Sequence, residues 1–216
     1  ANLGLAYDGD ADRLIAVDEN GNIVDGDHIM ILSAIHLKNK GKLAQDTLVV
    51  TVMSNIGLKI AAQEHGINLA TTAVGDRYVL EEMKNSGFNL GGEQSGHMIF
   101  LDYNTTGDGV LSSLVLAQIV LEEGKNLSEL AAIMTLYPQV LVNARIKNEN
   151  KKRYMEYPEI KSEIERIEKL LNGCGRVLIR PSGTEPLVRV MLEGKEEGQI
   201  RELATNLANL IQEKLS

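Results

Sequence analysis

Three aspartates alternate with small residues near the start of the chain, in the stretch Asp8-Gly-Asp-Ala-Asp-Arg13. Carboxylates this close together repel one another unless a cation lies between them. Their oxygens are hard ligands, which favour Mg²⁺ or Ca²⁺ over Zn²⁺. Because apolar, strand-like segments flank the stretch on both sides, the sequence predicts a divalent metal site formed by Asp8, Asp10 and Asp12 in a loop between two strands.

Two other interpretations of this loop stay open. Asp8, Asp10 and Asp12 match the first, third and fifth ligands of an EF-hand, and Glu19 falls at its twelfth position. However, Arg13 stands where the EF-hand turn needs glycine, and the flanking segments are strands instead of helices. The loop could also be an acidic turn that is simply solvated.

A glycine-rich stretch, Gly91-Gly-Glu-Gln-Ser-Gly-His97, lies between two other strand-like segments. Glycines permit positive φ angles and let a backbone approach a ligand closely. Glu93 offers an acceptor and Ser95 a hydroxyl, which are the groups needed to hold the hydroxyls of a sugar. His97 carries an imidazole, a group that can act as acid or base, and could exchange a proton with such a hydroxyl. The alternative is an ordinary hairpin loop with a solvent-facing histidine.

A third loop, with the sequence Arg-Pro-Ser-Gly-Thr-Glu-Pro, begins at Arg180 and joins two predicted strands. Ser182, Thr184 and the backbone N–H groups around Gly183 could form a concave nest for an anion. Arg180 offers planar, bidentate donors that fit a phosphate, and Arg189 is close enough in sequence to join the same site. The alternative is a rigid turn with surface arginines. A P-loop is disfavoured, because no Gly-Lys-Ser/Thr ending is present.

The stretch Val74-Gly-Asp-Arg-Tyr78 lies at a predicted strand-to-helix junction. Loops at the carboxyl edge of a parallel sheet are favoured ligand positions, so Asp76 and Arg77 are candidate substrate-binding residues. Asp76 could equally be an N-cap for the helix that follows.

The elements that position these loops fall into three segments. Residues 1–22 are predicted to form two or three strands with a hairpin turn at Asn20-Gly21, which cannot bury a core alone. We expect them to be the remnant of a preceding domain. The start at Ala1, next to a strand-like segment, is expected to be a truncation or cleavage point.

Residues 23–136 alternate between helical and strand-like patterns, which predicts a mostly parallel sheet covered by helices. The clearest strand is the continuous apolar run 47–53, which is typical of a fully buried position. Further strands are expected at 67–74, 88–90 and 98–101, and helices at 27–37, 58–65, 77–85 and 110–121.

Residues 137–216 are expected to form a smaller α+β domain with two helices on one face of a sheet. The first helix should begin at Pro158 and the second should run to the end of the chain. The charged stretch 147–157 is expected to be an exposed connection, with Lys151-Lys-Arg153 on a solvated surface. Strands are predicted at 139–146, 176–180 and 187–192.

Composition bounds the class of protein. At 216 residues the chain is long enough for one or two domains, and a content of 44% hydrophobic and 24% charged residues is ordinary for a globular protein. The core should be aliphatic, since Trp is absent and only 2 Phe occur. A net charge of −8 argues against partnership with nucleic acid or a membrane, and no run of about 18 apolar residues and no signal-peptide pattern is found. The single Cys174 is expected to be a reduced thiol in a cytoplasmic protein.

Taken together, the three loops resemble those of the α-D-phosphohexomutase superfamily. The metal loop 8–13, the sugar loop 92–97 and the phosphate loop 180–186 occur in that family's order and span essentially the whole chain. Gln94, with the stretch 74–78, is most similar to the members that act on glucosamine phosphates. Phosphomannomutases and phosphoglucomutases more often carry another residue at the position of Gln94.

The resemblance implies a four-domain enzyme, in which three related α/β units are followed by a smaller, mobile fourth domain. On that plan residues 1–22 end the second domain, residues 23–136 form the third and residues 137–216 form the fourth. Asp8, Asp10 and Asp12 would hold one Mg²⁺ per active site, and His97 and Arg13 would be catalytic residues. The implied substrate-binding residues are Asp76, Arg77, Glu93, Ser95, Arg180, Ser182, Gly183, Thr184 and Arg189.

The implied reaction moves a phosphoryl group between the 6 and 1 positions of glucosamine phosphate, in cytoplasmic bacterial amino-sugar metabolism that leads to UDP-N-acetylglucosamine and peptidoglycan precursors. It would use a phosphoserine and a glucose- or glucosamine-1,6-bisphosphate intermediate. The family's Ser-His-Asn-Pro-type loop is absent, because Ser54-Asn55 is followed by Ile56-Gly57. We therefore expect the chain to be inactive alone and to need N-terminal domains of the same protein, with a homodimer as a further assembly.

Three other functions stay open from the sequence. The chain could belong to a phosphomannomutase or phosphoglucomutase, it could bind phosphosugars without catalysis, or it could be a Ca²⁺-binding interaction protein. Comparing the activity on glucosamine, glucose and mannose phosphates would separate the enzymes. Direct binding of phosphosugar or of Ca²⁺ would separate the two binding functions.

Overall fold

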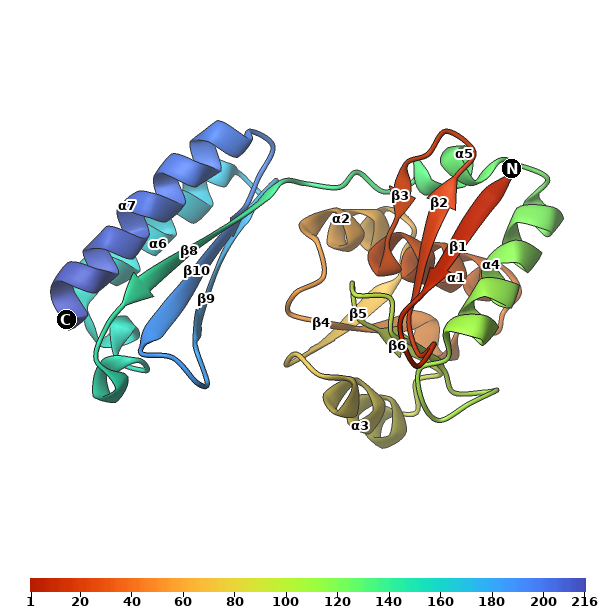
Figure 1. Ribbon diagram of the computed structural model, residues 1–216, viewed down its shortest axis with the longest axis horizontal. Helices are drawn as coiled ribbons and strands as arrows, with labels where there is room; N and C mark the ends of the chain where they lie inside the picture. The colour runs from red at the N-terminus through yellow and green to blue at the C-terminus, as the bar shows by residue number, and fades with distance from the viewer. The chain divides into compact units, whose positions relative to one another are not determined.

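The computed structural model describes all residues from Ala1 to Ser216, and the chain divides into two compact units (Figure 1). The first unit comprises Ala1–Leu136 and the second comprises Tyr137–Ser216. The strands within residues 1–22 share a core with the elements that follow them, because Leu14 and Ala16 are fully buried in the main hydrophobic cluster of the first unit.

A three-stranded antiparallel sheet opens the first unit, with β2 in its middle. The hairpin turn that the sequence predicts is present, with φ of +90° at Gly21 and a 2.9 Å bond from the Asn20 N–H to the Asp18 carboxylate. The acidic loop follows directly from β1 and leads into β2, so the sheet fixes both of its ends. The strands are β1 (Leu3–Tyr7), β2 (Leu14–Asp18) and β3 (Ile23–Val24).

The second sheet of this unit has four strands in the order β5-β4-β6-β7. β4 pairs in parallel with β5 and β6, whereas β6 and β7 form an antiparallel hairpin that carries the sugar loop. Every residue of β4 is buried, as its continuous apolar sequence indicates. The predicted mixed, mostly parallel α/β sheet is confirmed. Its strands are β4 (Thr47–Thr51), β5 (Asn68–Thr72), β6 (Leu90–Gly92) and β7 (Met98–Phe100).

Helices cover both faces of this sheet. Leu48 and Val50 of β4 share a cluster with α1, whereas Val49 packs with α3 on the other face, as the alternation of side chains along a strand requires. α1 is buried along most of its length and lies at the centre of the unit (Figure 1). The helices are α1 (Gly26–Asn39), α2 (Ile56–Glu64), α3 (Asp76–Ser86), α4 (Gly109–Glu123) and α5 (Leu127–Ala131), with a short 3₁₀ turn, η1 (Ala44–Asp46), before β4.

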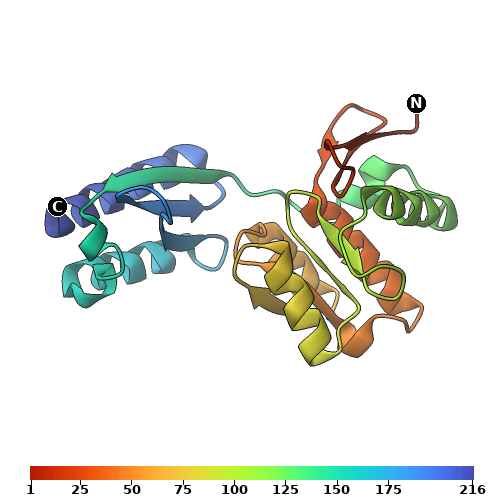
Figure 2. The same ribbon diagram turned by 60° about the horizontal axis from the view of Figure 1, so that its bottom comes forward.

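The second unit is a three-stranded antiparallel sheet, in the order β8-β10-β9, with two helices on one face (Figure 2). Val188, Val190 and Leu192 of the central strand are completely buried against these helices. The predicted α+β unit is confirmed. Its elements are β8 (Gln139–Arg145), η2 (Asn148–Asn150), η3 (Tyr154–Glu156), α6 (Pro158–Leu171), β9 (Arg176–Pro181), β10 (Leu187–Glu193) and α7 (Glu197–Leu215).

The prediction for the segment between β8 and α6 was only partly right. Residues 147–157 contain the turns η2 and η3, and Tyr154 and Tyr157 pack against the core of the second unit. The aromatic side chains anchor a stretch whose charges alone suggested an exposed connection. Across the whole chain, no helix combines the length and apolar character that crossing a membrane requires.

Candidate functional site

The acidic loop between β1 and β2 brings three carboxylates together. Asp8, Asp10 and Asp12 each place one oxygen within 4.8 Å of the others. The loop is held by a positive φ of +58° at Ala11, whose carbonyl accepts a 2.9 Å bond from the N–H of Gly109 at the start of α4. A Cβ at Gly109 would come within 2.9 Å of that same carbonyl oxygen, so the close approach of α4 requires glycine.

The electrostatics of the loop fit a divalent cation. Burial raises the pKa of Asp12, and a hydrogen bond with Asp8 and the charges of Asp10 and Asp8 raise it further, against the opposing effect of His97. Asp12 Oδ1 is buried and accepts no hydrogen bond. The three carboxylates repel one another when all are ionised. A bound Mg²⁺, which prefers such oxygen ligands, would stabilise their ionised forms.

The sugar loop lies directly against the acidic loop. Arg13 and His97 form a β-bridge, and the N–H of Leu14 donates to the carbonyl of Gly96 at 3.1 Å. His97 Nε2 lies 3.6 Å from Asp12 Oδ2. These backbone contacts join two stretches that are far apart in the sequence, and they give the two predicted loops one shared edge.

His97 is enclosed by its surroundings, with only 3% of its surface exposed. A Cβ at Gly107 would come within 2.6 Å of the ring carbon Cε1, so Gly107 is the residue that lets the ring lie flat against the chain. The Nδ1 atom of His97 is buried without a hydrogen bond, and its Nε2 atom faces Asp12. The solvent-facing histidine of the hairpin alternative is therefore wrong.

The side chain of Arg13 lies beside two carboxylates of the acidic loop. Its Nε is 3.7 Å from Asp8 Oδ2 and 3.9 Å from Asp12 Oδ1, and its side chain is half-exposed. Together with Asp8 and Ser95 it lines a shallow pocket of about 270 Å³. The pocket thus combines a carboxylate, a guanidinium group and a hydroxyl in reach of one small polar ligand.

A third predicted stretch, the loop before α3, reaches the sugar loop through Glu93. The Glu93 carboxylate accepts a 2.9 Å bond from the N–H of Gly75, whose φ is +131°. Asp76 is the first residue of α3 and makes no capping hydrogen bond, so the N-cap alternative is not observed. Arg77 lies over the ring of Tyr78 at 5.6 Å, and neither Asp76 nor Arg77 forms an ion pair.

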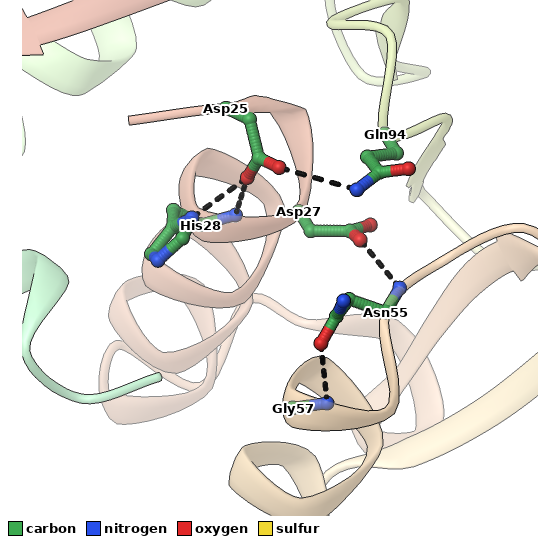
Figure 3. Close-up of polar contacts among 6 residues, drawn as sticks. All are labelled: Asp25, Asp27, His28, Asn55, Gly57 and Gln94. Atoms are coloured by element: carbon green, nitrogen blue, oxygen red, sulfur yellow. Dashed lines mark hydrogen bonds and ion pairs between the residues drawn. The ribbon is translucent and has the colours of Figure 1, made fainter. Parts of the chain in front are cut away.

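The sugar loop is held on α1 by Asp25 and Gly26, which were not among the predicted site residues (Figure 3). Asp25 caps α1 and binds His28 Nδ1 at 2.7 Å, and its second oxygen accepts a 3.4 Å bond from Gln94 Nε2. Burial alone would raise the pKa of Asp25, but the bonds and charge from His28 outweigh it and leave the pKa lowered. The N–H of Gly26 also donates to the Gln94 carbonyl at 3.1 Å. Gln94 therefore holds the loop on α1.

Asp27 links the same end of α1 to the loop after β4. Its side chain is completely buried, and Oδ2 accepts a 2.6 Å bond from the N–H of Asn55, whose own side chain caps α2 through Gly57 (Figure 3). Burial raises the pKa of Asp27 to about 7. The Asp-Gly-Asp-His order of residues 25–28 was the available sequence signal for this cluster.

The phosphate loop lies in the second unit, between β9 and β10. Arg180 and Arg189 stand directly opposite each other in the antiparallel register. Like charges in such a pair destabilise a sheet unless an anion lies between them. Arg189 is 3.5 Å from the carboxylate of Glu185, an exposed contact that contributes little by itself.

The tip of the phosphate loop is shaped by Ser182. Its N–H donates to the carbonyl of Leu187 at 3.0 Å, and its hydroxyl oxygen accepts from the N–H of Glu185 at 3.1 Å. Ser182 is buried, whereas Gly183 and Thr184 are exposed. The structure thus gives Ser182 an organising position and leaves Gly183 and Thr184 open to a ligand.

Two models of known protein domains match the chain, one over most of the first unit and one over most of the second. Residues 25–137 match the model of the phosphoglucomutase/phosphomannomutase α/β/α domain III, and residues 141–210 match that of the C-terminal domain of the same family. The chain belongs to the phosphoglucomutase/phosphomannomutase family. The resemblance that the three loops indicated is confirmed.

Relatives within the family cover the whole chain. It is 83% identical over 216 residues to a phosphoglucosamine mutase of Clostridioides difficile (strain 630) and 64% identical to one of Caldanaerobacter subterraneus subsp. tengcongensis. In both cases the match covers 100% of this chain and 48% of the relative. The chain thus spans about half the length of the curated relatives it matches.

Two solved structures share the fold of this chain. The Aspergillus fumigatus N-acetylphosphoglucosamine mutase in complex with GlcNAc-6P and magnesium has a TM-score of 0.77 at 22% identity, covering 98% of this chain and 49% of that one. A phosphoglucomutase/phosphomannomutase family protein of Burkholderia thailandensis has a TM-score of 0.78 at 20% identity, covering 100% of this chain and 48% of that one.

Proposed function

We propose that the chain is half of an enzyme that interconverts glucosamine 6-phosphate and glucosamine 1-phosphate by phosphoryl transfer. The observation that carries the proposal is the joining of the acidic loop to the sugar loop, through the Arg13–His97 bridge and the bond from Leu14 to Gly96. A metal site and a sugar site that share an edge are what phosphoryl transfer to a sugar hydroxyl needs. The names of the relatives that match at 83% and 64% identity support the choice of sugar.

In this proposal Asp8, Asp10 and Asp12 hold one Mg²⁺. When bound, the ion would offset the negative charge of the transferring phosphoryl group. Arg13, beside Asp8 and Asp12, adds a positive charge on the pocket side of the loop. One structural neighbour was solved in complex with magnesium, which is consistent with this donor set.

Glu93 and Ser95 hold the hydroxyls of the sugar. Because Gly75 binds one oxygen of Glu93, the carboxylate is fixed before the substrate arrives, and preorganised acceptors need no rearrangement on binding. His97 exchanges a proton with the reacting hydroxyl, and its Nε2 faces the metal loop where that hydroxyl must lie. Asp76 and Arg77, next in sequence to Gly75, contact the substrate from the start of α3.

Arg180, Gly183, Thr184 and Arg189 hold the phosphate that is not transferred, in a loop that Ser182 organises. The opposed arginines and the exposed N–H groups form the two halves of an anion nest. A bisphosphate intermediate, glucose- or glucosamine-1,6-bisphosphate, would present each of its phosphates in turn. A structural neighbour was solved with glucose1,6bisphosphate, which is consistent with this scheme.

The remaining half of the enzyme would supply the phosphoserine. On the proposed plan, residues 1–22 complete a second domain, residues 23–136 are the third domain and residues 137–216 are the fourth. β1 is an edge strand, so a longer chain could continue its sheet. The cytoplasm is the proposed location, and a homodimer is a further expected assembly.

A comparison of substrates tests the proposal. In the full-length protein, kcat/KM for glucosamine phosphate should exceed the values for glucose and mannose phosphates by at least about tenfold, a difference of about 1.4 kcal/mol in transition-state binding. The 216-residue chain alone should show no turnover, because it lacks the serine loop. Preference for a hexose phosphate, or turnover by this chain free of longer enzyme, would contradict it.

A further inference from the structure

The charged segment of residues 147–157 is fastened beside the phosphate loop. The hydroxyl of Tyr154 donates to the carbonyl of Ile179 on β9 at 3.3 Å, and Asn150 Nδ2 donates to the carbonyl of Leu215 at the end of α7 at 2.9 Å. The aromatic ring of Tyr154 packs against the core of the second unit. These anchors lie on either side of Lys151 and fix the position of its backbone.

Lys151 makes a direct contact with the phosphate loop. Its Nζ donates to the carbonyl oxygen of Ser182 at 2.8 Å. The other polar groups of Ser182 are engaged within the loop, the N–H with Leu187 and the hydroxyl with Glu185. The carbonyl is therefore the group through which Ser182 is held from outside the loop.

The Ser182 carbonyl and the Gly183 N–H belong to one planar trans peptide unit. In such a unit the C=O and N–H bonds point in opposite directions. This peptide unit can rotate easily, because Gly183 has no Cβ to restrict its backbone. The space around Gly183 is also open, since no heavy atom lies within 4 Å of the position that a Cβ would occupy. Fixing the carbonyl at Lys151 therefore also fixes the direction of the Gly183 N–H, away from Lys151.

We propose that Lys151 is a positioning residue of the phosphate loop, holding the Ser182 carbonyl so that the Gly183 N–H faces the bound phosphate. The proposal rests on the phosphate-binding function proposed above for this loop. Without the Lys151 contact, the peptide unit can turn and present the carbonyl oxygen, a partial negative charge, to the anion. Lys151 acts by orienting a backbone donor, and its own ammonium group stays on the far side of the peptide from the ligand.

The neighbouring Lys152 provides a matched control. It is exposed and makes no hydrogen bond or ion pair, and it carries the same charge as Lys151. The variants K151M and K152M each remove one positive charge and change the long-range field about equally, so a difference between them isolates the contact with Ser182. K151R keeps both the charge and a donor, and it should restore the wild-type behaviour.

Titration of the ¹⁵N-labelled 216-residue chain with inorganic phosphate tests the proposal by NMR. In the wild type, the amide resonances of Gly183 and Thr184 should move as phosphate is added. K151M should weaken phosphate binding about fivefold to tenfold and should shrink the limiting shift of the Gly183 amide at saturation. K152M should stay within about twofold of the wild type. Unchanged resonances of Val190 on β10 show that the unit stays folded.

Four results would overturn the proposal. Equal weakening by K151M and K152M would mean that only charge matters. Weaker binding by K151M with an unaltered limiting shift of Gly183 would mean that the peptide is held without Lys151. A full loss of binding in K151R would exclude a donor role. If the wild type itself shows no shift of the loop amides, the phosphate assignment of the loop fails first, and the inference falls with it.

Discussion

The fold should keep Asp27 protonated in mildly acidic solution, up to about pH 7, and replacing it by asparagine should stabilise the first unit in alkaline solution. The carboxyl is completely buried, and burial raises its pKa from 3.8 to about 7. At 1.36 kcal/mol per unit of pKa, this difference corresponds to roughly 4 kcal/mol between the neutral and the ionised form. The side-chain amide of an Asp27→Asn variant would keep the oxygen that accepts from Asn55 and would carry no charge.

The sign of the pH dependence follows from the raised pKa. Between 3.8 and about 7 the folded chain binds a proton that the unfolded chain has lost, so stability falls as the pH rises through this window. Asp27→Asn should therefore be close to the wild type only below about pH 4, where both the folded and the unfolded wild type keep the proton. Near about pH 8 it should be more stable, by up to roughly 4 kcal/mol, with relaxation around the buried charge reducing the measured value.

Urea unfolding followed by methyl NMR separates the two units. The signal of Ile31 on α1 reports the first unit, and that of Ile200 on α7 reports the second. Only the Ile31 transition should shift in Asp27→Asn, and only at the higher pH. Asp46→Asn, at an exposed position whose carboxylate is 3.5 Å from Lys38 Nζ, should change stability by less than about 1 kcal/mol at either pH. If the advantage of Asp27→Asn over the wild type is no larger at high pH than at low pH, the carboxyl is not held protonated by its burial.

Three further predictions concern the candidate site of the first unit. Asp12→Asn should weaken Mg²⁺ binding at least about tenfold in calorimetry, because one of the three oxygen donors loses its charge, and unchanged affinity would exclude the loop as the metal site. Asp25→Ala should cost about 1 kcal/mol of stability, because α1 loses its N-cap. The variant should also exchange the amide hydrogen of Gly26 faster, because Gln94 loses its bond to Asp25. An unchanged exchange rate at Gly26 would show that other contacts hold Gln94. Gly107→Ala should destabilise the first unit by roughly 1–3 kcal/mol in urea unfolding, since its methyl group would overlap the ring of His97, and a neutral effect would place that ring elsewhere.

The sequence was most informative where a local pattern has one physical meaning. The uninterrupted apolar run that includes β4 is typical of a strand buried on both faces, and β4 is buried at every position. Glycines at 87 and 124 end α3 and α4 in the left-handed conformation, close to the predicted ends. The carboxylate spacing of the acidic loop likewise sufficed to place three oxygens together.

The sequence was least informative where a contact joins residues far apart in the chain. Lys151 was expected on a solvated surface, because a run of basic residues carries no sign of the carbonyl of Ser182 that it binds. Asp25 and Gln94 are 69 residues apart, and no periodicity links them. The residue type of Asp76 could not show whether it caps α3 or lies inside it, because the exact start of a helix is poorly specified by sequence. In the structure Gly75 is the N-cap and Asp76 is the first helical residue. Such tertiary contacts follow from how strands and helices meet, which a single sequence does not specify.

Whether the acidic loop and the sugar loop form one site can be measured with a paramagnetic metal. Mn²⁺, a substitute for Mg²⁺, can be added to the ¹⁵N-labelled chain, and its broadening of amide resonances reports proximity to the metal. We expect Gly96 and His97 to broaden together with Asp10, and all three effects to disappear in Asp12→Asn. Broadening of the acidic loop with sharp, unaffected signals for Gly96 and His97 would mean that the two loops do not share a site.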